Sequence, residues 1–130
     1  MDGGSKTILL VDDEPNVTRL AGARLQANGY SVVTAADGAE ALAAARRLSP
    51  DLMILDLNLP KLDGFEVARR LKADGSTRGI PIVILSARTQ EADLIRGREL
   101  GVEGYLTKPF QSQELLNVIA GLIGRRGDGA

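Results

Sequence analysis

The chain has 130 residues, 16 basic and 17 acidic side chains and a formal net charge of −1. This length suits one domain that buries roughly two thirds of the surface of its unfolded chain. Cysteine and histidine are absent, which excludes disulfide frameworks, thiolate zinc sites, Ser-His-Asp hydrolases and any phosphohistidine on this chain.

The remaining composition also narrows the class of protein. The charges are balanced, and the aromatic residues are two tyrosines and two phenylalanines, so we expect no direct binding to nucleic acid. No apolar stretch approaches the ~20 residues of a membrane helix, and residues 1–5 lack the charged and apolar regions of a signal peptide. The default expectation is a cytoplasmic protein without membrane insertion.

Five short strand-like runs, each followed by a helical pattern, succeed one another along the chain. Three of them, Ile8–Val11, Leu52–Leu55 and Ile82–Leu85, are continuous apolar runs of the kind found in strands buried on both faces. The second and fifth strands are expected at 30–35 and 104–107. Strands that alternate with helices of ten or more residues predict a parallel sheet with right-handed crossovers. The fold class is therefore α/β, a doubly wound (βα)5 sheet with helices on both faces.

Turn and capping residues indicate where the helices begin and end. Pro15 opens the first helix and Asn28-Gly29 closes it, in keeping with the preference for proline at the start and glycine after the end. Asp37 and Glu40 form a capping-box pattern for the second helix. The remaining boundaries are Ser49-Pro50 after the second helix, Gly64 and Asp74-Gly75 around the third, and about Thr89 to Leu100 for the fourth.

The last helix carries an apolar stripe that leaves two interpretations open. We expect Leu115, Ile119 and Leu122 to face the sheet. Leu116 and Ile123, seven residues apart, then form either a small exposed patch for a partner or the margin of a wide core stripe. Residues 1–5 and 125–130 are expected to be flexible, which leaves one domain over residues 6–124 and no second domain.

Polar groups follow the predicted strands at the ends where ligands bind in open parallel sheets. Asp12, Asp13 and Glu14 follow the first strand, and Asp56 follows the third. Two like charges ~4 Å apart repel by about 4 kcal/mol at an effective dielectric constant of about 20, so a clustered set must keep protons or bind a cation. Oxygen ligands with open positions favour Mg²⁺ over an all-protein calcium cage.

With Asp12 and Asp13 on a magnesium ion, Asp56 is free to act as a nucleophile toward a phosphoryl group. Ser86 follows the fourth strand and Lys108 the fifth. One phosphoryl oxygen can then lie on Lys108, one on Ser86 and one on the metal, which supplies the charge neutralisation that phosphoryl transfer requires.

These residues resemble the receiver domains of two-component response regulators, from Lys6 to about Gly124. Any one of the matching motifs alone would be weak, but together they occur in the family's order, each near a predicted strand end. The motifs are Val11–Pro15, Asp51–Asp56, Leu59-Pro60 with Asp63-Gly64, Leu85–Ala87 and Lys108–Phe110.

The resemblance implies a strand order of 2-1-3-4-5 and a set of site roles. Asp56 would be the phosphoryl acceptor, Asp13 a direct magnesium ligand, Asp12 a ligand largely through water, and the backbone carbonyl of Asn58 a further ligand. Lys108 would pair with the phosphoryl group. The Lys108-Pro109 peptide bond would be cis.

The resemblance also implies a switch and its partners. Ser86 would move toward the phosphoryl group while Tyr105 rotates inward, which would alter the surface of the fourth helix, fifth strand and fifth helix. A histidine kinase or phosphotransfer protein would supply the phosphoryl group, and a downstream protein would bind the altered surface. Asn58 and Arg88, at positions that vary in the family, would tune hydrolysis. The chain would be a signalling switch that turns over no metabolite.

Simpler interpretations remain for the individual residues. Asp12 to Glu14 alone could be a solvated turn that caps the first helix, and Ser86 alone a cap or turn residue. Lys108 alone could be a surface charge. Tyr105 alone fits core or edge packing at least as well as a switch.

Two other classes use comparable residues. An aspartate-nucleophile magnesium phosphatase of the haloacid-dehalogenase kind would need an aspartate at position 58, where this chain has Asn58, and a late acidic pair. A flavodoxin-like cofactor binder would need a Ser-, Thr- and Gly-rich loop after the first strand. Whether the receiver is free-standing or part of a larger regulator stays open. The stretch Leu71–Pro81 resembles free-standing, hybrid-kinase and cyclase-linked receivers more than those of winged-helix transcription factors.

Overall fold

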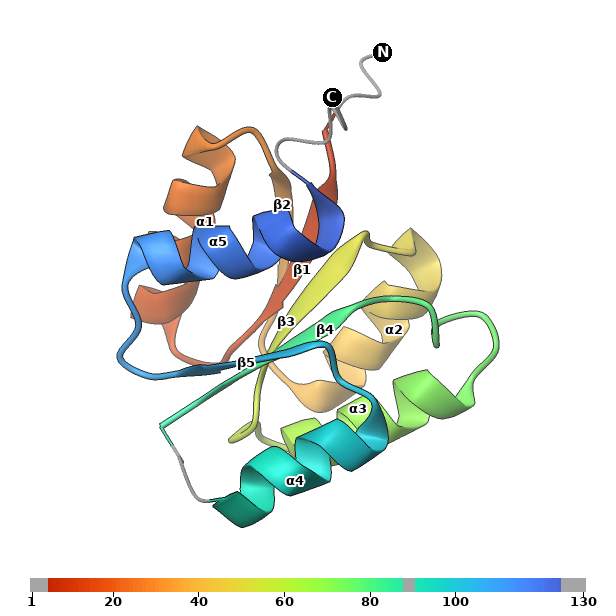
Figure 1. The fold of residues 1–130 in the computed structure, drawn as a ribbon. Helices are drawn as coiled ribbons and strands as arrows, with labels where there is room; N and C mark the ends of the chain where they lie inside the picture. Colours follow the sequence, from red (N-terminus) through yellow and green to blue (C-terminus); the bar gives the residue numbers. More distant parts are fainter. Residues whose placement is uncertain (1–4, 88–90, 125–130) are drawn as a thin grey trace.

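Five parallel strands form one sheet in the order β2-β1-β3-β4-β5, shown in Figure 1. The computed structural model describes residues 5–87 and 91–124. The elements in chain order are β1 (Thr7–Val11), α1 (Pro15–Ala27), β2 (Ser31–Ala35), α2 (Gly38–Leu48), β3 (Leu52–Asp56), α3 (Gly64–Ala73), β4 (Ile82–Ser86), α4 (Glu91–Leu100), β5 (Gly104–Thr107) and α5 (Ser112–Ile123). The predicted α/β class and the strand order implied by the resemblance are both confirmed.

Helices cover both faces of the sheet. Helices α1 and α5 lie on one face, and α2, α3 and α4 lie on the other (Figure 1). Strands β3 and β4 are buried at every position, and β1 is buried from Ile8 onward, whereas the edge strands β2 and β5 are partly exposed. The side chains of the central strands alternate between the two apolar clusters, which is why these strands are continuous apolar runs.

The apolar stripe of α5 differs from one of the two predicted arrangements. Leu115 and Ile119 are buried as expected, but Leu122 is 36% exposed and does not face the sheet. Leu116 and Ile123 instead pack partly against the core cluster of this face, so the stripe is wide and rotated toward them. Of the two interpretations, the wide core stripe is supported and the exposed patch at Leu116 and Ile123 is not; the expectation that Leu122 faces the sheet is wrong.

Most predicted helix ends hold, with one difference in capping. Asp37 Oδ1 accepts a hydrogen bond from the backbone N–H of Glu40 at 2.8 Å, as predicted. The Glu40 carboxylate does not close the capping box; it accepts from the backbone N–H of Ala36 at 2.7 Å. The second strand begins at Ser31, one residue after the buried Tyr30. The predicted start of the fourth helix at Thr89 lies outside the described residues.

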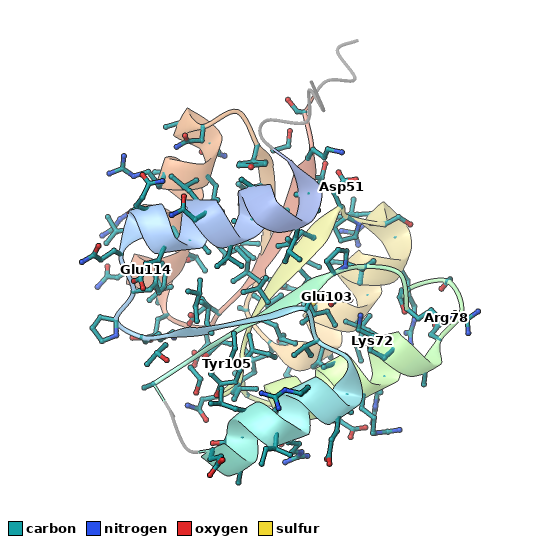
Figure 2. The ribbon with its side chains drawn as sticks, viewed as in Figure 1. Asp51, Lys72, Arg78, Glu103, Tyr105 and Glu114 are labelled. Atoms are coloured by element: carbon teal, nitrogen blue, oxygen red, sulfur yellow. The ribbon has the colours of Figure 1, made fainter. Side chains whose placement is uncertain are left out.

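Two acidic side chains at the amino-terminal edge of the sheet were not predicted. Asp51 Oδ2 accepts from the backbone N–H of Thr7 at 2.7 Å, and Glu103 Oε1 accepts from the backbone N–H of Ile82 at 2.8 Å. Lys72 completes the second contact, with its Nζ 2.9 Å from Glu103 Oε2; Figure 2 shows Lys72 beside Glu103. These carboxylates bind the first N–H groups of two strands.

Among the described residues, no helix is both long and apolar enough to cross a lipid bilayer.

Gly64, at the first position of α3, allows the chain to turn closely around the end of β3. Its backbone N–H donates to the carbonyl of Leu57 at 2.9 Å. A Cβ atom added at Gly64 would lie 2.5 Å from the carbonyl oxygen of Asp56 and 2.7 Å from the Cα of Leu57. Both of these are backbone atoms, which cannot move aside without displacing the strand end that carries Asp56.

We therefore expect Gly64→Ala to lower the free energy of unfolding by about 2 kcal/mol or more, because overpacking against backbone forces a shift of the chain. The matched control is Gly121→Ala in α5, where a new Cβ meets nothing within 4 Å and where alanine should add up to about 1 kcal/mol of helix stability. Urea unfolding of the two variants measures the difference. Equal free energies of unfolding for both variants would contradict the close approach.

Candidate functional site

The ends of β1 and β3 bring three carboxylates together at the carboxyl-terminal edge of the sheet. Val11 pairs with Leu55 in the parallel register, so Asp12 and Asp56, the next residues, lie side by side. Carboxylate oxygens of Asp12, Asp13 and Asp56 all lie within 4.8 Å of one another. Asp12 is 2% exposed and Asp56 is 3% exposed, whereas Asp13 is exposed to solvent. The predicted acidic cluster is therefore present.

Lys108 enters this cluster from the end of β5. Its backbone N–H donates to the carbonyl of Ser86 at 2.8 Å, and the Lys108-Pro109 peptide bond is cis. The Nζ atom lies 2.9 Å from Asp12 Oδ2 and 3.5 Å from Asp56 Oδ1. It also donates a hydrogen bond to Glu14 Oε1 at 3.3 Å. One ammonium group thus faces three carboxylates.

The environment opposes the ionised form of Asp56. Burial raises the pKa of Asp56, and the neighbouring charge of Asp12 raises it further. The positive charge of Lys108 and the backbone N–H of Asn58 act in the opposite direction, but the net pKa stays above its usual value. Burial lowers the pKa of Lys108, yet the carboxylates of Asp12 and Asp56 outweigh that effect and its pKa is raised. The ammonium group is therefore held charged, and Asp56 still lacks full compensation.

The oxygen atoms present fit a hard divalent cation. Asp12 Oδ2 is fully buried and has no hydrogen-bond partner. The Lys108 ammonium faces this oxygen in an ion pair, with Nζ 2.9 Å away. That one cation is shared with Glu14 and Asp56, so negative charge remains that a bound divalent cation would neutralise. Asp13 adds a second carboxylate with open solvent access, which suits an ion such as Mg²⁺ that retains several waters.

Three further predicted site residues lie on β4, on β5 and in the loop after β3. Ser86 ends β4 and is fully buried, next to the strand end that carries Asp56. Tyr105 pairs with Ile84 in the register of β4 and β5, and its side chain is half-buried against the cluster of the α2, α3 and α4 face. Asn58 is exposed in the loop after β3. Arg88 lies outside the described residues.

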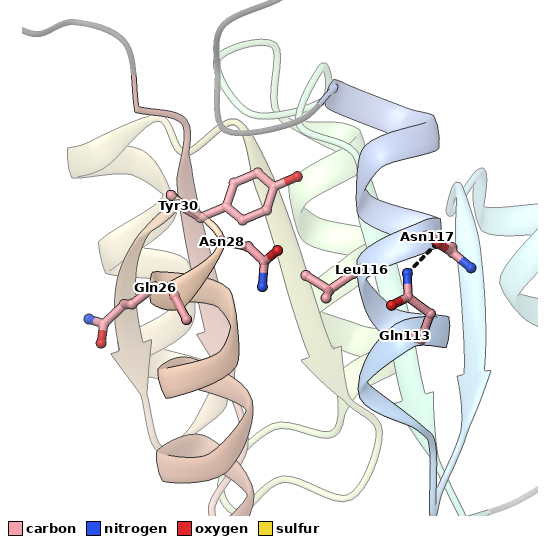
Figure 3. Close-up of a pocket in the computed structure, with 8 residues that line it drawn as sticks. Gln26, Asn28, Tyr30, Gln113, Leu116 and Asn117 are labelled. Atoms are coloured by element: carbon pink, nitrogen blue, oxygen red, sulfur yellow. Dashed lines mark hydrogen bonds between the residues drawn. The ribbon is translucent and has the colours of Figure 1, made fainter.

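A cavity between α1 and α5, away from the acidic cluster, has no charged side chains in its lining. A crevice of about 580 Å³ lies between the end of α1 and α5 (Figure 3). Gln113 Nε2 donates to Asn117 Oδ1 across one turn of its wall. The lining side chains are uncharged: Gln26, Ala27, Asn28, Gly29, Tyr30, Gln113, Leu116 and Asn117. None of them can accept a phosphoryl group through a carboxylate or neutralise its charge.

Comparison with known proteins agrees with this geometry. Over 118 residues the chain is 44% identical to the DNA-binding dual master transcriptional regulator RpaA of Synechocystis, a match that covers 91% of this chain and 49% of the relative. Among solved structures, the chemotaxis protein CheY4 of Vibrio cholerae superposes with a TM-score of 0.86 at 34% identity, covering 91% of this chain and 98% of that one.

A second structural neighbour is a receiver domain with a metal. The receiver domain of the sensor histidine kinase PA1611 of Pseudomonas aeruginosa, crystallised with a magnesium ion coordinated in its active-site cleft, gives a TM-score of 0.85 at 35% identity, covering 92% of this chain and 98% of that one. The chain spans about half the length of the curated relatives it matches. Residues 8–120 match the family described as response regulator receiver domain. The chain therefore belongs to the response regulator receiver domain family.

Proposed function

We propose that this receiver accepts a phosphoryl group on Asp56, with Mg²⁺ bound, and that the product changes the surface presented to a partner. The observation that carries the proposal is the position of Asp56. It is a nearly fully buried carboxylate, 3.5 Å from the Lys108 ammonium, with the carboxylates of Asp12 and Asp13 at the same edge. The crevice between α1 and α5, in contrast, has no charged lining residue.

The donor we propose is the phosphohistidine of a histidine kinase or a phosphotransfer protein. An Asp56 carboxylate oxygen attacks phosphorus, a bond between that oxygen and phosphorus forms, and the nitrogen–phosphorus bond of the donor breaks with its electron pair returning to the imidazole. Lys108 neutralises charge on the transferred group, and the Ser86 hydroxyl donates to a second oxygen. Hydrolysis of the acyl phosphate returns Asp56 and inorganic phosphate, and no metabolite is turned over.

Asp12, Asp13, Asp56 and the backbone carbonyl of Asn58 are the groups that we propose would hold Mg²⁺. The ion supplies positive charge at the phosphoryl oxygens. The buried Asp12 oxygen without a hydrogen bond supports this assignment, as does the magnesium ion named for the PA1611 receiver. We further propose that Asn58 and Arg88 tune the rate of hydrolysis.

The switch that we propose connects Ser86 and Tyr105 to the surface of α4, β5 and α5. Gly97 is the buried residue of α4, and a Cβ added there would lie 3.9 Å from Tyr105 Cδ2 and 3.2 Å from Val102 Cγ2. Helix α4 thus packs through Gly97, near the Tyr105 ring, and through the partly buried Leu100. A helix with so little buried surface can shift at low energetic cost when a new dianion alters the neighbouring strand ends.

The wider setting of this receiver is also a proposal. We infer that residues 6–124 act as the receiver unit, in the cytoplasm, and control a protein partner without touching nucleic acid themselves. The regulators named among the relatives are DNA-binding proteins about twice as long, which supports the alternative of a receiver that works within a longer regulator. Neighbours named as a chemotaxis protein and as a kinase receiver support the free-standing or hybrid-kinase setting. A magnesium phosphatase is disfavoured because Asn58 offers no acid.

The first test is the intact mass of the protein after incubation with Mg²⁺ and a small acyl-phosphate donor. We expect the wild type to gain one phosphoryl group, and we expect no gain in Asp56→Asn or after chelation of magnesium, because the amide is not a nucleophile and the charge stays uncompensated. Asp51→Asn, at the opposite edge of the sheet, is the matched control and should be phosphorylated like the wild type. Phosphorylation of Asp56→Asn would exclude Asp56 as the acceptor.

The raised pKa of Asp56 predicts a dependence of stability on pH and Mg²⁺. The Asp56 carboxyl keeps its proton to higher pH in the folded chain than in the unfolded chain. The favourable contribution of protonated Asp56 to the free energy of unfolding is therefore lost as pH rises through the raised pKa. In chelator at neutral pH we expect Asp56→Asn to raise the free energy of unfolding by about 1 kcal/mol. The difference in free energy of unfolding between Asp56→Asn and the wild type should become smaller as pH decreases toward the usual carboxyl pKa of 3.8.

Urea unfolding with and without Mg²⁺ measures both effects. Added Mg²⁺ should stabilise the wild type more than Asp56→Asn, because the substitution removes a ligand and the repulsion that the ion relieves. A wild type whose free energy of unfolding does not respond to Mg²⁺ would count against the proposed metal site.

A further inference from the structure

We propose that Glu14 is a positioning residue that occupies one donor of the Lys108 ammonium group and thereby limits how strongly Lys108 engages a phosphoryl group on Asp56. This inference rests on the proposed function. It concerns a side chain that is not one of the three carboxylates of the metal cluster and that contacts the site at Lys108.

The contact is built into the start of α1. Glu14 is the N-cap residue of this helix, and its carbonyl accepts the backbone N–H groups of Val17 and Thr18 at 3.1 and 3.2 Å. Its own backbone N–H donates to Asp12 Oδ1 at 3.0 Å. The backbone of Glu14 is therefore held by the helix on one side and by the site on the other. Its side chain extends from this fixed point to Lys108 Nζ at 3.3 Å.

The three contacts of Lys108 are not equivalent. An ammonium group has three donors, and Lys108 Nζ faces Asp12 at 2.9 Å, Glu14 at 3.3 Å and Asp56 at 3.5 Å. The Asp12 and Asp56 side chains are 0% and 4% exposed, whereas that of Glu14 is 62% exposed. Loss of a buried carboxylate contact leaves an uncompensated charge in the interior, but water readily replaces the contact with Glu14.

The difference in exposure decides which contact a phosphoryl oxygen displaces. The Lys108 side chain is 16% exposed, so the donor that points toward solvent and Glu14 is the one that an incoming group can reach. While Glu14 holds this donor, a phosphoryl group on Asp56 must compete for it. Removal of the Glu14 carboxylate therefore frees a donor of Lys108 and leaves its two buried partners in place.

The experiment measures the affinity for beryllofluoride, a stand-in for the phosphoryl group, at saturating Mg²⁺ in four proteins. We expect Glu14→Gln to bind beryllofluoride about twofold to fivefold more tightly than the wild type, the range that an exposed ion pair contributes. Glu14→Asp keeps the charge but shortens the side chain, so it should behave like Glu14→Gln if contact matters. Glu91→Gln, which removes an exposed carboxylate from α4, should match the wild type. The affinity for Mg²⁺ alone should be unchanged in all four.

Several outcomes would overturn the proposal. Weaker or equal binding in Glu14→Gln would show that Glu14 assists Lys108 or does not act on it. Wild-type affinity in Glu14→Asp would assign the effect to the field of the charge, and a changed affinity for Mg²⁺ would make Glu14 part of the metal site.

A second measurement separates the contact from the function. Urea unfolding of Glu14→Gln, Lys108→Met and the double variant without metal should be non-additive.

The two measurements fail in different ways. If the wild type binds no beryllofluoride, the proposed function is wrong and the role of Glu14 is overturned with it, even where the unfolding cycle still shows the contact. If the wild type binds beryllofluoride but the unfolding cycle is additive, the proposed function stands and the positioning role of Glu14 is overturned.

Discussion

The imbalance of charge at the carboxyl-terminal edge of the sheet is the constraint on which the rest of the structure depends. Three carboxylates lie within 4.8 Å of one another, and one ammonium group, that of Lys108, faces the two buried members of the set. Two central strands must be held side by side for these charges to meet. The continuous apolar sequences of β1, β3 and β4 do this, because their burial on both faces stabilises the sheet without help from the site.

The helices bury different numbers of apolar residues against the sheet. This difference determines which helix could shift most easily if the site changed. Helices α1 and α5 contribute residues to a shared apolar cluster, and α2 and α3 contribute most of the helical residues of the other. Helix α4 contributes one buried glycine, the partly buried Leu100 and a cation–π contact, with the Arg96 guanidinium 4.3 Å from the Phe65 ring centroid. An exposed contact of this kind is worth about 1 kcal/mol or less. Helix α4, which lies close to Tyr105 at Gly97, therefore has fewer buried residues than α2 and α3.

Structure could be predicted from the sequence most reliably where only one structural role fits a residue type at its position. Buried strands, Pro15 at a helix start and aspartates at strand ends could all be predicted, because periodicity and local chemistry decide them. The orientation of α5 could not be, since Leu116, Leu122 and Ile123 are equally apolar and only tertiary packing selects between them. The contact of Glu40 with Ala36 and the hydrogen bond of Glu103 with Ile82 could not be predicted for another reason. The sequence does not show which backbone N–H group a carboxylate will accept from, because the arrangement of the folded chain decides it.

The two edges of the sheet place acidic residues in different surroundings. At the amino-terminal edge, parallel strands present free N–H groups, and the carboxylates of Asp51 and Glu103 accept hydrogen bonds from them. At the carboxyl-terminal edge the strands present carbonyl oxygens, which offer a carboxylate no donor. Carboxylates there must find other N–H groups or a cation: Asp12 Oδ1 accepts from the backbone N–H of Glu14, and Asp12 Oδ2 faces the Lys108 ammonium. The same type of side chain thus satisfies backbone donors at one edge, and at the other it forms the acidic cluster on which the proposed metal and phosphoryl site depends.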